Sequence, residues 1–168
     1  MSTDEKKVTD QYLTFTLAEE MFALDIAMVS EVLEFQNITK IPRTPKFMRG
    51  VINLRGRAIP VVDLRMKFQM GETEKTVDTC IIIVEVDMDG ETAVIGALAD
   101  SVHEVFEMPE EQIEPPPRLG TRIDTDFIRG MGRQDEEFII VLDINQVFSS
   151  EELTLLQDAE TGEEGLAA

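Results

Sequence analysis

The side chains that most often carry out chemistry in proteins are scarce in this sequence. His103 is the only histidine and Cys80 the only cysteine among 168 residues. Neither a zinc site nor a cysteine–histidine nucleophile pair is therefore expected. Cys80 lies in the apolar run "CIIIV", which favours a buried small hydrophobe over a reactive thiol. We expect no catalytic residue and no metal site.

Glycine-rich phosphate-binding patterns are missing as well. The sequence "GMG" at 130–132 lacks a third glycine at the required spacing, and no GxxxxGK[ST] pattern occurs. The many carboxylates are dispersed over predicted turns and hairpin faces, where solvation explains them. The sequence predicts a protein that is not an enzyme and that binds no cofactor.

Charge is distributed unevenly along the chain. The formal net charge is −19, which argues against a nucleic-acid partner because neutralising phosphates requires a basic footprint. Residues 40–67 nevertheless contain eight basic residues and one acid. We call this stretch the basic island and expect an acidic partner to face part of it. Within it, we expect Lys40, Lys46 and Lys67 to be a solvated rim.

The first third of the chain has the pattern of a β-hairpin followed by helical turns. The run "QYLTFTL" at 11–17 alternates apolar and polar residues, and "MFALDI" follows after a short polar turn. Apolar residues of 26–35 fall on one half of a helical wheel, which predicts a short amphipathic helix. The segment "TPKFMRG" at 44–50 is predicted to be a helical turn with Thr44 as its N-cap.

The basic island contains two β-type runs, "VINL" and "AIPVV", which are joined by the turn "NLRGR". Gly56 permits a tight reversal, and this places Arg55 at the tip of the turn. Pro60 has no amide hydrogen to donate, so it predicts an edge strand or a bulge. Asp63 is expected to cap a short helix that follows.

The second half of the chain is also predicted to be β. Strands are expected in "TCIIIVEV", "TAVIGALA" and "SVHEVFEM", and a last hairpin joins "FIRGMG" to "EFIIVLDI" through residues 132–137. Ser149 and Glu152 form a capping box that begins a final helix over about residues 150–157. Residues 1–10 are expected to be flexible, and residues 158–168 a disordered acidic tail.

These elements predict a single domain over residues 11–157. The polar segment at 70–78 divides it into lobe one, about 11–70, and lobe two, about 77–148. The apolar runs are too short to span a bilayer, and the first ten residues contain no apolar targeting segment. We therefore expect a cytoplasmic protein without direct membrane insertion.

Several segments taken together resemble the CheW family of bacterial chemotaxis adaptor (coupling) proteins. They are "YLTFTLAEEMFALDIAMVSEVLE", "IPRTPKFMRGVINLRGRAIPVVDLR", "GALADSVHEV", and "FIRGMG" followed by "IIVLDI". The resemblance covers about residues 11–156 in order. It implies a mainly β fold of two small five-stranded Src-homology-3-like barrels packed together, with short helices and a C-terminal helix.

The resemblance also implies a noncatalytic adaptor function. Proteins of this family couple the cytoplasmic tips of chemoreceptors, the methyl-accepting chemotaxis proteins, to the regulatory domain of the histidine kinase CheA in signalling arrays. The chain is then expected to associate with membrane-bound arrays through its protein partners. Two alternatives are a β-barrel interaction module of another two-component or scaffold system, and a coupling domain from a larger receiver-fused adaptor. The acidic tail with no second domain after it disfavours the latter.

Carried over position by position, the resemblance implies two sets of binding residues. The receptor-binding set is Val29, Glu31, Gly50, Arg55, Val102 and Val105. The kinase-binding set is Ile95 and Leu119. Receptor tips are helical coiled coils rich in glutamate, so an electropositive loop beside an apolar groove suits them. Arg55 and Glu31 are expected to pair across that groove.

Overall fold

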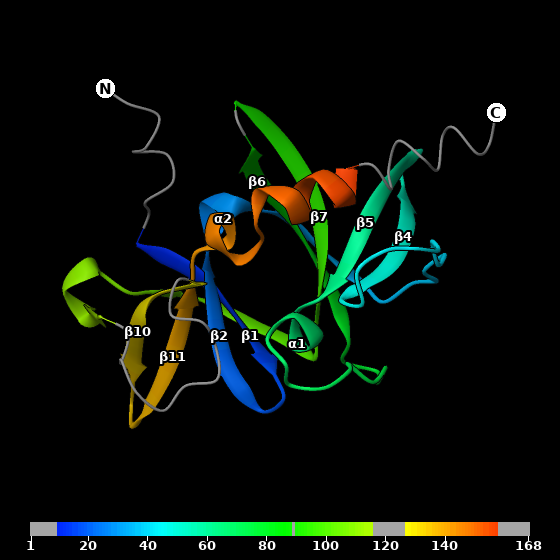
Figure 1. Ribbon diagram of the computed structural model, residues 1–168. Helices are drawn as coiled ribbons and strands as arrows, with labels where there is room; N and C mark the ends of the chain where they lie inside the picture. Colours follow the sequence, from blue (N-terminus) through cyan, green and yellow to red (C-terminus); the bar gives the residue numbers. More distant parts are fainter. Residues whose placement is uncertain (1–9, 89, 116–126, 158–168) are drawn as a thin grey trace.

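Two β-sheets account for most of the computed structural model, which describes residues 10–88, 90–115 and 127–157 (Figure 1). Sheet A has the strand order β8-β1-β2-β11-β10-β9, and sheet B has the order β3-β6-β7-β5-β4. The strands of sheet A are β1 (Gln11–Leu17), β2 (Glu20–Asp25), β8 (Ser101–Glu107), β9 (Ile113–Glu114), β10 (Ile128–Gln134) and β11 (Glu137–Leu142). Those of sheet B are β3 (Val29–Glu34), β4 (Met48–Leu54), β5 (Arg57–Asp63), β6 (Cys80–Met88) and β7 (Glu91–Ala99).

Short helices connect or flank these strands. They are η2 (Ile26–Met28), α1 (Leu64–Lys67), η3 (Glu110–Gln112) and α2 (Ile144–Val147), followed by a helix over residues 150–157. The expected mainly β fold with short helices and a C-terminal helix is confirmed. Sheet B has five strands as expected, while sheet A gains a sixth because the two-residue strand β9 pairs with β10.

The two sheets do not coincide with the expected lobes of residues 11–70 and 77–148. Strand β3 pairs with β6, and β8 pairs with β1, so each sheet combines strands from both halves of the sequence. Sheet A joins β1 and β2 to β8–β11, and sheet B joins β3–β5 to β6 and β7. Only Asp100 separates β7 from β8. A hairpin needs a connection of at least about two residues, so β8 cannot fold back beside β7 and passes into sheet A instead.

The hairpins β4–β5 and β10–β11 are structural repeats of each other. Gly50 pairs with Val61, and Gly130 pairs with Val141, and every other paired position also recurs 80 residues later. Both second strands then pair in parallel, β5 with β7 and β11 with β2. The outer strands correspond too, because "VSEVLE" of β3 and "VHEVFE" of β8 occupy equivalent places in the two sheets.

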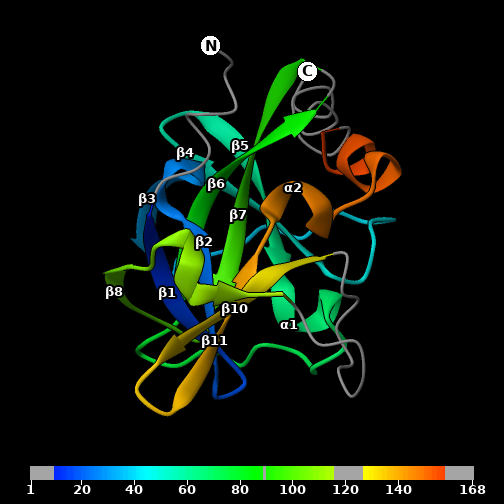
Figure 2. The ribbon, with the colours of Figure 1, turned by 90° about the vertical axis from the view of Figure 1, so that its left-hand side faces the viewer.

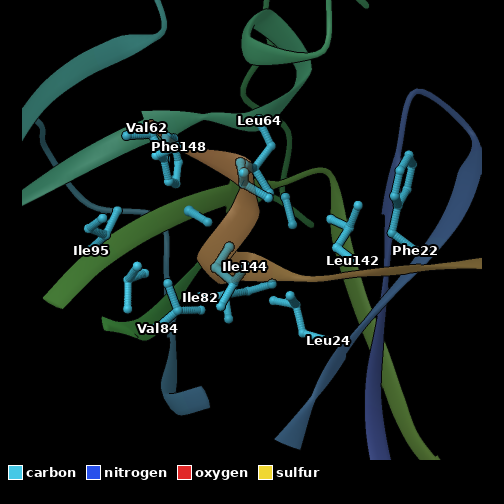
Figure 3. Packing of buried hydrophobic residues seen from close by; sticks show 14 of the residues in the cluster. Phe22, Leu24, Val62, Leu64, Ile82, Val84, Ile95, Leu142, Ile144 and Phe148 are labelled. Atoms are coloured by element: carbon cyan, nitrogen blue, oxygen red, sulfur yellow. The ribbon is translucent and has the colours of Figure 1, made fainter. Parts of the chain in front are cut away.

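Burial on both faces of the sheets explains the continuous apolar runs of the sequence. The largest core cluster joins the sheets and includes Phe22 and Leu24 of β2 together with Ile82 and Val84 of β6 (Figure 3). Smaller clusters cover the opposite faces, around Ile81 and Ile83 in sheet B and around Tyr12 and Ile139 in sheet A. Alternate residues of β6 thus enter different cores, which is why "CIIIV" contains no polar residue.

The predicted helix at 26–35 is wrong beyond its first residues. Three residues form η2, and Val29 then begins β3, which pairs with β6. The register shifts between Val29 and Glu31, so Val29 and Val32 both oppose residues of the shared core. This bulge produces an i, i+3 apolar spacing within a strand, which is the spacing of a helix face.

The helical turn predicted at 44–50 is also wrong. The Met48 amide donates to the Pro45 carbonyl at 2.9 Å in a reverse turn, and Arg49 and Gly50 lie within β4. Strand β5 is internal rather than an edge, but its pairing with β7 begins only at Val61, one residue after Pro60. The missing amide hydrogen of proline is therefore not needed on that side.

The predicted Asp63 cap and Ser149–Glu152 capping box are confirmed, and the turn of the last hairpin is tighter than the expected residues 132–137. Asp63 accepts hydrogen bonds from the amides of Arg65 and Met66 and so caps α1. The amide of Ser149 donates to the Glu152 carboxylate at 2.9 Å, and the Glu152 amide donates to the Ser149 hydroxyl at 3.0 Å. Strand β10 continues to Gln134, so the turn is a two-residue one.

Candidate partner-binding surface

Val29 and Val32 of β3 lie beside the core cluster that the two sheets share. Val29 pairs with Val84, and Val32 pairs with Ile82, both members of the shared core. Val29 is half-buried against this core, whereas Val32 is 40% exposed. The apolar side of β3 therefore begins in the core and continues onto the surface.

Strand β8 repeats this arrangement in the other sheet. Val102 pairs with Phe15 and is half-buried against the shared core, while Val105 pairs with Leu13 and is 47% exposed. A register shift again keeps both valines on one face. We call Val29, Val32, Val102 and Val105 the valine surface. Single exposed apolar residues are ordinary, but here two equivalent edge strands each present a valine pair.

The outer strands β3 and β8 lie on the same side of the molecule (Figure 2). Cys80, the first residue of β6, pairs with Glu34 of β3, and its sulfur interacts with the backbone of Val102 in β8. Burial raises the pKa of the Cys80 thiol, while the Val102 backbone acts in the opposite direction. Cys80 is only half-buried, contrary to the expected core position. It lies between Glu34 of β3 and the backbone of Val102 in β8.

Arg55 stands at the tip of the β4–β5 turn, as predicted. Its φ of 53° and that of Gly56, 86°, form the two-residue reversal, and the Gly56 amide donates to the Asn53 side chain at 2.8 Å. The guanidinium Nη2 of Arg55 donates to Glu31 Oε2. The expected Arg55–Glu31 pair is therefore present, and it joins the β4–β5 turn to β3 beside the valine surface.

Most of the Arg55 side chain is still free to bind a partner. The side chain is 70% exposed, whereas that of Glu31 is 28% exposed. The hydrogen bond and the charge of Glu31 raise the pKa of Arg55, so the guanidinium remains charged under all physiological conditions. A guanidinium has five N–H donors. Several donors therefore remain for carboxylates of another molecule.

Gly50 and Ile95 do not contribute side chains to this surface. Gly50 is buried in β4 with a φ of 140°, and a Cβ there would lie 2.1 Å from the Thr39 carbonyl oxygen. Thr39 and Val51 exchange backbone hydrogen bonds of 2.9 and 2.8 Å, so glycine is required for this close pairing. Ile95 is 1% exposed and packs in the shared core. Leu119 lies outside the described residues.

Val32 was missed by sequence reasoning because it was assigned to a helix face. The signal that identifies it is the internal repeat, since "VSEV" at 29–32 corresponds to "VHEV" at 102–105. Val32 is the counterpart of Val105, a residue already implied at the receptor-facing groove. The repeat thus adds Val32 to the candidate surface.

Other cations of the basic island form ion pairs with carboxylates of the same chain. Arg49 Nη1 lies 3.0 Å from the buried carboxylate of Asp63, and Arg65 Nη1 lies 3.2 Å from Asp100. Lys67, expected on a solvated rim, has a side chain only 14% exposed and binds Glu152 at 3.2 Å. Its Nζ also lies 5.4 and 5.1 Å from the centroids of the Phe47 and Phe127 rings. Lys67 therefore joins α1 to the C-terminal helix.

The described residues contain neither a metal-binding cluster nor a membrane-spanning helix. No group of three or more histidine, cysteine, aspartate and glutamate side chains in residues 10–88, 90–115 and 127–157 could hold a metal ion. Over the same ranges, no helix is both long and apolar enough to cross a membrane. The His103 ring nitrogen Nε2 instead lies 2.6 Å from the hydroxyl of Thr16 and 3.1 Å from that of Ser101.

Comparisons with known proteins show the family to which the chain belongs. The family model of the CheW-like domain matches residues 11–152. The chain belongs to the CheW family. It is similar to the chemotaxis protein CheW of Klebsiella aerogenes, with 34% identity over 90% of this chain and 89% of the relative. It is also similar to that of Treponema pallidum, with 33% identity over 87% and 86%.

A solved structure agrees with this assignment. The scaffolding protein TtCheW from Thermoanaerobacter tengcongensis matches with a TM-score of 0.75 and 43% identity, covering 86% of this chain and 91% of that one. The chain is thus a chemotaxis scaffolding (coupling) protein of the CheW family and not an enzyme. The resemblance inferred from the sequence is confirmed.

Proposed function

We propose that this CheW protein couples the cytoplasmic tips of chemoreceptors to the regulatory domain of the histidine kinase CheA. It would act in the cytoplasm and join membrane-bound arrays through these partners alone. The observation that carries the proposal is the valine surface beside the Arg55–Glu31 pair. Together they place exposed apolar side chains next to the exposed guanidinium of Arg55.

The receptor tip binds to the valine surface in this proposal. An amphipathic helix buries apolar side chains spaced by three or four residues, and the exposed parts of Val32 and Val105 supply apolar area on both sides of such a helix. Glutamates of the receptor accept hydrogen bonds from the free donors of Arg55. Glu31 holds the guanidinium in place and also makes the site less attractive to inorganic anions.

The kinase docks elsewhere in this proposal, so that both partners can be bound at once. Leu119 is the proposed kinase contact. Ile95 has no exposed side chain with which to meet a partner, so its part in docking is limited to packing beneath the surface. Receptor binding and kinase binding are therefore expected to be separable by mutation.

Charge reversal at the ion pair tests this assignment. We expect Arg55→Glu to weaken binding of a receptor cytoplasmic fragment by about tenfold or more, while binding of the kinase regulatory domain is unchanged. Glu31→Arg in the same chain should restore part of the receptor affinity if the pair shapes the surface. Equal losses toward both partners, or none toward the receptor, would refute the assignment.

A further inference from the structure

Three cations of the basic island have no carboxylate partner among the described residues. Lys40, Arg43 and Lys46 are exposed and lie on the loop between β3 and β4. Arg49, Arg55, Arg65 and Lys67 are by contrast all paired with carboxylates of the same chain. In a protein with a net charge of −19, three unneutralised cations on one loop create a local reversal of the electrostatic potential.

These three side chains surround a hollow of about 350 Å³. Ile41, Met48 and Met66 contribute apolar side chains to its lining, and Glu72 is the one carboxylate. Glu72 lies 3.9 Å from Arg49, whose guanidinium is already bound to Asp63. The hollow therefore combines a partly apolar lining with a rim that remains positive.

The backbone at Arg43 provides an independent observation. Arg43 follows Pro42 in a turn and has a φ of 64°. Glycine or asparagine ordinarily occupies this left-handed position after proline, because a larger side chain costs conformational energy there. An arginine at such a place is consistent with a side chain retained for contact outside the chain.

We propose that this hollow binds an acidic, amphipathic segment of a partner protein. An aliphatic side chain of the segment enters the hollow, and carboxylates on either side of it meet Lys40, Arg43 and Lys46. The apolar lining favours such a segment over a compact anion, which would use only the charged rim. Figure 1 shows the loop (cyan) outside β4 and β5, far from β10 and β11. The site shares no residue with the valine surface, so it goes beyond the receptor contact proposed above.

The test uses a fluorescein-labelled peptide with repeated Glu-Glu-Leu triplets and measures its fluorescence anisotropy with the full chain. Arg43→Gln with Lys46→Gln should weaken binding by about tenfold, since two surface ion pairs are lost. The matched control is Lys75→Gln with Arg133→Gln, which changes the net charge equally at two exposed cations outside the hollow. The control should bind like the unmodified protein, and a peptide with glutamine in place of glutamate should bind weakly to all.

Four outcomes would overturn the proposal. Equal losses in both double variants would mean that net charge alone attracts the peptide. Displacement by inorganic tripolyphosphate as effective as by unlabelled peptide would assign the hollow to a small anion, and stronger binding of anionic lipid vesicles than of the peptide would assign it to a membrane surface. Arg43→Gly adds a second readout. Removing the backbone strain at residue 43 should raise the melting temperature, while peptide binding falls. A lower melting temperature would mean that the Arg43 side chain serves the stability of the loop itself, and this too would overturn the proposal.

Discussion

Replacing Val32 and Val105 by threonine should weaken receptor binding without weakening the fold. These valines are 40% and 47% exposed and occupy equivalent places on the two outer strands. Burying a whole valine side chain is worth about 1.5–3 kcal/mol, so covering the exposed part of each is worth about 1 kcal/mol. Loss of both contributions corresponds to about a thirtyfold increase in Kd.

Threonine is the appropriate substitution because it keeps the β-branched shape that suits a strand. Isothermal titration with a receptor cytoplasmic fragment would measure the affinity, and thermal unfolding would measure stability. Surface substitutions of this kind change stability by about 0.5 kcal/mol or less. Val77→Thr is the matched control, since Val77 is 99% exposed on the loop before β6 and lies outside the valine surface.

The expected pattern is a large increase in Kd for Val32→Thr with Val105→Thr, and none for Val77→Thr. If all three substitutions act alike, binding depends on general surface hydrophobicity. If the double variant melts many degrees lower, the two valines belong to the core, and the reasoning from their exposure is wrong.

Three further outcomes follow from the repeat and from the shifted pKa values. Asp63→Asn should cost about 3 kcal/mol in urea unfolding, because it leaves Arg49 without its buried partner. The equivalent Asp143→Asn should change the free energy of unfolding by only about 0.5 kcal/mol or less, since Asp143 only caps α2 through one amide and asparagine caps a helix as well as aspartate. Burial raises the pKa values of Tyr12 and Cys80 above 10.0 and 9.0. The folded state then holds these protons more tightly, so the free energy of unfolding should fall as the pH rises above 9.0, and less so in Tyr12→Phe.

Local features of the fold could be predicted from the sequence because each depends on a few adjacent residues. The Ser149–Glu152 box and the Asp63 cap need only a side chain and the amides of the next turn. The position of Arg55 at a turn tip follows from Gly56 beside it. The Arg55–Glu31 contact came from the family resemblance, since the two residues are distant in the sequence.

Long-range features could not be predicted in the same way. The combination of strands from both halves of the sequence in each sheet depends on which strands pair, and apolar periodicity does not encode the partner. The bulge after Val29 gave the apolar residues of β3 the spacing of a helix face, so Val32 was assigned to a helix and not to the binding surface. Ile95 was assigned to docking although its strand is buried on both faces, which only the packing of two cores reveals. The recurrence of "VSEV" of β3 as "VHEV" of β8, 73 residues later, would have identified Val32.

Reconstitution of receptor fragment, kinase and this protein tests the central claim most directly. Kinase autophosphorylation is measured with all three components and with each omitted in turn, using this protein unmodified or with Arg55→Glu. The account predicts activation by receptor only when the unmodified protein is present, and a loss of activation in Arg55→Glu while kinase binding persists. Full activation of the kinase by receptor in the absence of this protein, or full activation with Arg55→Glu, would contradict it.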